Sequence, residues 1–164
     1  MPDQPDSDDR AMMEEILRSE VVGHLAMACG DEPYVVPINY AYGDGRILLH
    51  CALDGRKLGF LRGNPAVCFE VCRQDASPTP HAEDSCDAAF VSVICYGTAR
   101  IIEDLAERQA LLSAFQARYS TAQTPREPIS LDRAVKCGAI EITVTRMTGR
   151  RHTGQEEITW EWEA

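Results

Sequence analysis

The stretch GHLAMACGDEPYVVPINYAYGDGRILLHCALDGRKLGFLRGNPAVCFEV, residues 23–71, decides the fold. Its first part alternates runs rich in β-branched and aromatic residues with turn signals, of which Asp44-Gly45 is a strong hairpin signal. It predicts three consecutive strands over residues 21–29, 33–42 and 47–51. Pro37 lies inside the second run and has no N–H to donate. It therefore predicts an edge strand or a bulge.

The second part predicts a short helix that opens on Gly55-Arg56-Lys57. Asp54 is a candidate N-cap, and Asn64-Pro65 ends the helix. A helix N-terminus offers free N–H groups and a positive dipole end, so it favours an anion. Two cations at that point add to the attraction. The turn therefore predicts a phosphate or carboxylate site; the alternative is that Arg56 and Lys57 are ordinary solvated charges.

The rest of the chain predicts a mainly antiparallel α+β barrel with flanking helices. Helical patterns cover residues 8–20, with Asp9 as a candidate cap, and residues 105–119. Strand patterns cover 66–72, 88–102 and 138–147, and alternation at 158–162 indicates a further short strand. Residues 73–87 and 120–128 are polar loops. We expect an acidic leader at 1–10, one domain at 11–152 and a tail at 153–164.

Composition narrows the classes of partner. The formal net charge is −10, which argues against nucleic acid and against an anionic membrane surface. No apolar run approaches the roughly 20 residues of a membrane helix. The leader has no apolar segment of the signal-peptide type, and the seven cysteines are an odd number. Together these features predict a cytoplasmic protein with reduced thiols.

Several single residues have a structural interpretation. His24 is expected to be structural and His81 solvated. Cys68 and Cys72 lie about 13 Å apart on a strand, too far for one metal ion or a disulfide. Cys86 is the expected exposed thiol. The tryptophans of the tail, at 160 and 162, are expected to pack, although covering a flavin or a dimer seam is the alternative.

Five segments, in order, carry a resemblance to a known family. They are GHLA at 23–26, PYVVPI at 33–38, ILLHCA at 47–52, GRKL at 55–58 and NPAVCF at 64–69. Shorter matches continue at 92–93, 97–99 and 140–150. The set resembles the pyridoxamine 5′-phosphate oxidase-like, FMN-binding split-barrel superfamily, and within it the nitroimidazole-resistance (Nim-like) branch. The resemblance covers residues 12–151.

The resemblance implies an FMN site built at a homodimer interface. It places the phosphate grip on Arg56 and Lys57, beside Gly55. The remaining flavin contacts that it implies are Val36, Pro37, Ile38, Asn39, His50, Cys51, Ser92 and Arg150. True pyridoxamine phosphate oxidases hold their substrate with C-terminal arginine and histidine residues, of which Arg150, Arg151 and His152 are only a faint echo. Vitamin B6 oxidation is therefore not expected.

His50 is the candidate catalytic residue. The resemblance links a histidine at this place to active-site chemistry, and an imidazole beside a flavin can donate a proton or tune the ring. The alternative is a histidine that is hydrogen-bonded within a strand. The leading hypothesis is a flavin-dependent oxidoreductase that acts on nitro-aromatic or similar small acceptors. The alternatives are a flavin- or haem-binding module without turnover, in which His24, His50 or His81 could ligate iron, and a structural dimer with an empty site.

Overall fold

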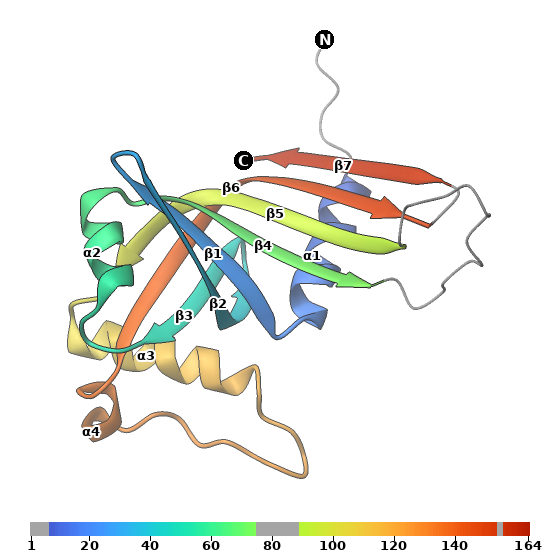
Figure 1. Cartoon of the computed structure of the whole chain (residues 1–164). Helices are drawn as coiled ribbons and strands as arrows, with labels where there is room; N and C mark the ends of the chain where they lie inside the picture. Colours follow the sequence, from blue (N-terminus) through green and yellow to red (C-terminus); the bar gives the residue numbers. More distant parts are fainter. Residues whose placement is uncertain (1–6, 75–88, 154–155) are drawn as a thin grey trace.

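The fold is a seven-stranded antiparallel sheet with four helices over the residues that the computed structural model describes, 7–74, 89–153 and 156–164 (Figure 1). The elements are α1 Ser7–Ser19, β1 Val22–Cys29, β2 Glu32–Gly43, β3 Arg46–Cys51, α2 Arg56–Gly63, β4 Ala66–Gln74, β5 Phe90–Ile101, α3 Leu105–Ala117, α4 Leu131–Ala134, β6 Gly138–His152 and β7 Glu157–Glu163. The predicted α+β class is confirmed. Cys86 and His81 lie outside the described residues.

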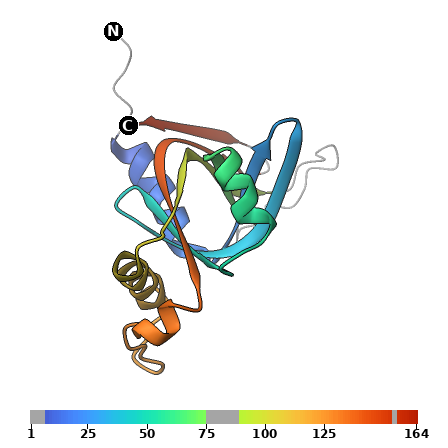
Figure 2. The same ribbon diagram turned by 90° about the vertical axis from the view of Figure 1, so that its left-hand side faces the viewer.

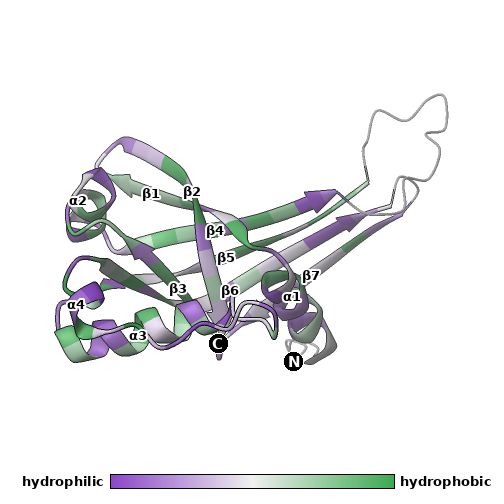
Figure 3. Cartoon of the chain, turned by 90° about the horizontal axis from the view of Figure 1, so that it is seen from below, coloured by the Kyte–Doolittle hydropathy of each residue, from purple (hydrophilic) through white to green (hydrophobic). Residues whose placement is uncertain are grey.

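The sheet closes into a ring and continues beyond it. Its strand order is β3-β2-β1-β4-β5-β6-β7, and β3 also pairs with β6, which closes the ring. In the view along the strands, α2 lies across one end of this ring (Figure 2). At the other end β4, β5, β6 and β7 run on as an extension, which is seen from below in Figure 3. The two ends of the barrel therefore differ in what surrounds them.

The hairpin between β2 and β3 turns as its sequence predicts. Asp44 and Gly45 both have positive φ, 52° and 70°, as a type I′ turn requires. The β2–β3 ladder runs from Gly43↔Arg46 to Tyr40↔Leu49 and ends there. Residues 32–39 of β2 pair with β1 on one side, and no other described strand pairs with them on the other. Pro37 lies in this half-paired stretch, so the edge-strand prediction is confirmed.

Two apolar clusters hold these parts together. The larger fills the barrel and includes Met13 and Leu17 of α1, both fully buried. The smaller lies under α3 and joins Leu112 to Ile102, Ile129 and neighbouring residues. It docks α3 and the connection to β6 against the outside of the barrel. None of the described helices has the length and apolar character needed to cross a membrane.

Three local predictions need correction. Helix α1 begins at Ser7, so Asp9 lies inside it and does not cap it. The final strand runs to His152, five residues beyond its predicted end, because it pairs with both β5 and β7 there. The short helix α4 was not predicted, since its four residues are too few to show a period. Trp160 of β7 is buried in the larger apolar cluster, as its packing interpretation predicts.

Candidate functional site

The N-terminus of α2 is open to an anion. Its N-cap is Gly55, with φ 140° and ψ 173°, and no side chain caps the helix. Asp54 is therefore not the cap, because Gly55 alone tolerates this φ and takes that position. The first turn contains no acidic residue, and a Cβ built on Gly55 meets nothing within 4 Å. No side chain of the cap or the first turn therefore accepts from the first N–H groups of the helix.

Arg56 and Lys57 differ in their surroundings. The Arg56 guanidinium forms an ion pair with Glu32 of β2 and lies over the Tyr34 ring, 4.5 Å from its centroid. Arg56 must leave Glu32 before it can contact a phosphate. Lys57 has no polar partner among the described residues. Lys57 is therefore the better-placed cation of the predicted pair.

His50 and Cys51, at the end of β3, lie within electrostatic reach of Lys57. Burial, followed by the positive charge of Lys57, lowers the pKa of His50. Burial raises the pKa of the Cys51 thiol, while Lys57 acts in the opposite direction. The His50 ring meets Phe115 of α3 edge-on, with 4.8 Å between centroids. His50 is therefore neutral at neutral pH and can donate from one ring nitrogen while accepting at the other.

The barrel splits where the β2–β3 ladder ends. Asn39 and His50 are the first residues beyond the last ladder pair, Tyr40↔Leu49. The predicted flavin-contact stretch of β2 leads up to this point: Val36 and Ile38 are half-buried, whereas Pro37 and Asn39 are exposed. Asn39 donates its side-chain amide to the Val21 carbonyl, 3.0 Å away. The structure thus brings the β2, β3 and α2 parts of the predicted site to one end of the barrel.

A cavity of about 410 Å³ opens at this split. Asn39 and His50 form its wall on the barrel side, and Phe115 and Tyr119 form the wall on the α3 side. The connection between α3 and β6 adds Arg126 and Arg133, among others. The Tyr119 hydroxyl donates to the Tyr40 carbonyl at 2.5 Å, which fixes the end of α3 to the last β2–β3 pair.

Sequence reasoning missed the α3 side of this cavity. Residues 120–128 show only a polar, proline-containing loop, and nothing local connects Arg126 with His50, 76 positions earlier. The one usable signal was the set of aromatic residues late in the predicted helix, Phe115 and Tyr119, which lie next to each other in the structure at 5.2 Å.

Ser92 and Arg150 lie elsewhere. They are direct cross-strand partners on β5 and β6, in the extension. Nine strand positions separate Ser92 from Ile101, at the ring end of β5, or about 30 Å. Arg150 pairs with Glu157 at 2.7 Å. A single chain therefore does not bring these two residues to His50 and Lys57.

His24 forms an exposed surface pair. Its Nδ1 lies 2.9 Å from a carboxylate oxygen of Glu70 on the neighbouring strand β4. This contact agrees with the structural interpretation of His24. The structure describes no group of three or more histidine, cysteine or acidic side chains, within residues 7–74, 89–153 and 156–164, that could hold a metal ion.

Comparison with known proteins supports the family resemblance. A family model described as pyridoxamine 5′-phosphate oxidase matches residues 9–151. An uncharacterized protein of Rhizobium meliloti, RA0666, is 37% identical over 51 residues, which are 30% of this chain and 32% of that protein. The alignment thus spans about a third of this curated relative.

Solved structures share the fold over most of their length. A candidate 5-nitroimidazole antibiotic resistance protein from Bacteroides thetaiotaomicron superposes with a TM-score of 0.75 at 21% identity, covering 94% of this chain and 87% of that one. An FAD-binding protein from Mesorhizobium loti superposes with a TM-score of 0.64 at 25% identity, covering 87% and 94%. The split-barrel architecture is therefore shared, and structural neighbours of this chain include a flavin-binding protein.

Proposed function

This chain belongs to the pyridoxamine 5′-phosphate oxidase family, and on that premise we propose that it is an FMN-dependent oxidoreductase. The observation that carries the proposal is the convergence of three features at one end of the barrel. These are the uncapped α2 N-terminus, the unpaired Lys57, and His50 beside the split between β2 and β3. FMN has a phosphate and a flat ring system. Its site therefore needs anion-binding groups for the phosphate and, next to them, polar groups for the ring.

The residues present fit FMN. The free N–H groups of α2 and the Lys57 ammonium would hold the phosphate, because both favour an anion. The half-paired β2 stretch from Val36 to Asn39 offers backbone groups that no described strand uses, and these suit the polar edge of a flavin. His50 would face the ring from β3, whereas the Cys51 side chain, next along the strand, points to the other face and packs against the larger apolar cluster. FMN, when bound, supplies the electron-transfer chemistry that no side chain can.

His50 would serve as the proton-handling group. Burial and Lys57 keep it neutral, so it holds a proton at one ring nitrogen and offers a lone pair at the other. The edge contact with Phe115 holds the ring in one orientation. A small acceptor, such as a nitro-aromatic compound, takes up protons together with electrons, and His50 lines the cavity in which a proton could be delivered.

A second copy of the chain completes the site in this proposal. Ser92 and Arg150 lie about 30 Å along the sheet from the ring end of the same chain. They can serve the same flavin as His50 only if another subunit contributes them. We therefore expect a homodimer in which Ser92→Ala weakens FMN binding. A monomer by light scattering, or unchanged FMN affinity in Ser92→Ala, would contradict this part.

The direct test is titration of the purified protein with FMN, followed by absorbance and flavin fluorescence. We expect saturable binding with one flavin per chain and the flavin absorbance bands. A protein that stays colourless and takes up no FMN would overturn the proposal. A Soret band from the protein as isolated would favour the haem-binding alternative instead.

Lys57→Ala tests the phosphate position. We expect FMN binding to weaken by about 1–3 kcal/mol, the scale of a charge-assisted hydrogen bond. Arg62→Ala is the matched control, because Arg62 lies in the last turn of the same helix and has no polar partner among the described residues. Equal FMN affinity in the two variants would show that the phosphate binds elsewhere.

A further inference from the structure

The cavity beside His50 has an aromatic lining. The Phe115 ring meets the His50 ring edge-on, with 4.8 Å between centroids. It also lies 5.2 Å from the Tyr119 ring, tilted against it, so the three rings form a continuous patch. Leu112 and Ile129, both buried, form part of the same lining. A volume of about 410 Å³ is within the range of small-molecule sites. The apolar part of this cavity suits a single flat ring.

Two solvent-exposed arginines contribute positive charge to the cavity lining. Arg126 and Arg133 both line it, and neither guanidinium has a hydrogen-bonding or ionic partner among the described residues. Seven other arginines of this acidic chain pair with glutamates, whereas Arg62 does not; the seven are Arg10, Arg18, Arg46, Arg56, Arg73, Arg100 and Arg150. Two cations that line one cavity, neither of them in an ion pair, favour an anion there.

The wall that carries these arginines is anchored to α3. Gln109 donates its side-chain amide to the Ile129 carbonyl at 2.8 Å. The Ile129 N–H donates to the Ser113 hydroxyl at 3.0 Å, and Ile129 itself is buried in the cluster under α3. Arg126 and Arg133 flank this anchored residue on the two sides. The backbone segment that carries the two arginines is therefore anchored to α3, which lowers the entropic cost of ordering that segment on binding.

We propose that this cavity binds a small aromatic carboxylate, with its ring against Phe115 and Tyr119 and its carboxylate between Arg126 and Arg133. The planar fork of each guanidinium matches a carboxylate. A monoanion is favoured over a phosphate dianion because Glu127 and Asp132 adjoin the two arginines in sequence and offset part of their charge. The role of this acid as the oxidoreductase substrate rests on the proposed function; its binding does not.

Calorimetric titration with 4-nitrobenzoate and its neutral isostere 4-nitrobenzamide tests the charge requirement. We expect the acid to bind about tenfold more tightly than the amide, the scale of one charge-assisted contact. Arg126→Gln and Arg133→Gln should each remove most of this preference. Arg62→Gln is the matched control, an unpaired arginine outside the cavity lining, and should keep it. Equal affinity for acid and amide would overturn the proposal.

Two further arms separate this proposal from the proposed function. Lys57→Ala should weaken FMN binding more than 4-nitrobenzoate binding, whereas Arg126→Gln and Arg133→Gln should weaken 4-nitrobenzoate binding more than FMN binding. Competition between FMN and 4-nitrobenzoate would overturn the proposal, because the cavity would then hold the flavin. Tighter binding of phenyl phosphate than of 4-nitrobenzoate would overturn the carboxylate assignment. Arginine-dependent acid binding without FMN uptake would support this inference while the proposed function fails.

Discussion

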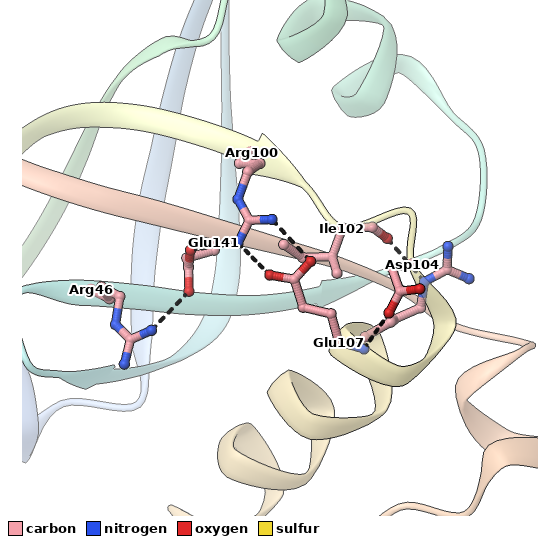
Figure 4. Close-up of polar contacts among 7 residues, drawn as sticks. Arg46, Arg100, Ile102, Asp104, Glu107 and Glu141 are labelled. Atoms are coloured by element: carbon pink, nitrogen blue, oxygen red, sulfur yellow. Dashed lines mark hydrogen bonds and ion pairs between the residues drawn. The ribbon is translucent and has the colours of Figure 1, made fainter.

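The two ends of α3 show two opposite uses of charge. At its N-terminal end Arg100 forms two hydrogen bonds with Glu107, at 2.6 and 3.0 Å, and Glu141 connects Arg100 to Arg46 (Figure 4). Asp104 caps the helix by accepting the Glu107 N–H at 2.8 Å. Every charge in this network has a partner within the chain.

At the C-terminal end Arg118 donates to the Arg18 carbonyl, but two arginines of the connection that follows do not pair. Arg126 and Arg133 face a cavity and have no partner among the described residues. The start of α3 and the connection that carries these two arginines pack on the same apolar cluster. On the proposal above, the paired charges attach α3 to the barrel, whereas the two arginines of the cavity lining are left for a ligand.

The largest expected effect lies in the apolar attachment of α3. Ile102 is 1% exposed and lies next to the paired end. Ile102→Ala should lower the free energy of unfolding by about 2–5 kcal/mol. Leu112→Ala should cost less, because Leu112 already borders the cavity and has fewer close-packed neighbours on that side. Denaturant unfolding measures both values. A larger loss at Leu112 would show that the cavity end, and not the paired end, holds α3 in place.

A smaller effect is expected at the helix cap. Asp104→Ala removes the acceptor of the Glu107 N–H and should cost about 0.5–2 kcal/mol. Ser130 occupies the same capping position on α4 but its side chain makes no cap hydrogen bond. Ser130→Ala is therefore the matched control, with an expected change within about 0.5 kcal/mol. Equal losses in thermal or denaturant unfolding would remove the contrast between a saturated end and an open one.

The sequence was sufficient for the features that neighbours in the chain determine. The Asp44-Gly45 turn, the edge character of Pro37 and the end of α2 before Asn64-Pro65 were all predictable. Each depends on the intrinsic backbone preference of one or two residues. The exchange of Asp54 for Gly55 as the α2 cap is a one-residue error, and boundaries of this kind are the least certain part of a sequence pattern.

Long-range partners were not predictable in the same way. Arg56 was interpreted from its helix position, yet in the structure it pairs with Glu32 across 24 positions and stacks on Tyr34. The cavity joins β2 and β3 to a loop more than 70 residues later. Register and chain topology decide such contacts, and neither has a local signal in a single sequence.

The smallest expected effect is on the pH dependence of stability. His50 at the cavity end and Glu107 at the paired end should contribute to it in different pH ranges. Burial and Lys57 hold the pKa of His50 below its ordinary value of 6.5. As pH falls, His50 is therefore protonated in the unfolded chain before it is protonated in the folded chain. His50 therefore lowers the free energy of unfolding only below pH 6.5, and increasingly so as pH falls. Hydrogen bonds from Arg100 hold the pKa of Glu107 below its ordinary value of 4.5. Its contribution is present above pH 4.5 and is lost as pH falls toward the folded-state pKa.

Two single variants should each remove the pH dependence in one of these two ranges. His50→Gln should flatten the stability profile just below pH 6.5 and leave the acid limb, whereas Arg100→Gln should weaken the acid limb alone. NMR titration of the His50 ring supplies the direct measurement, and Lys57→Ala should raise the pKa of His50 because it removes the neighbouring cation. An unchanged His50 pKa in Lys57→Ala would show that the Lys57 charge does not act on His50 at the cavity end. The proposed flavin site would then lose the link between its phosphate group and its proton donor.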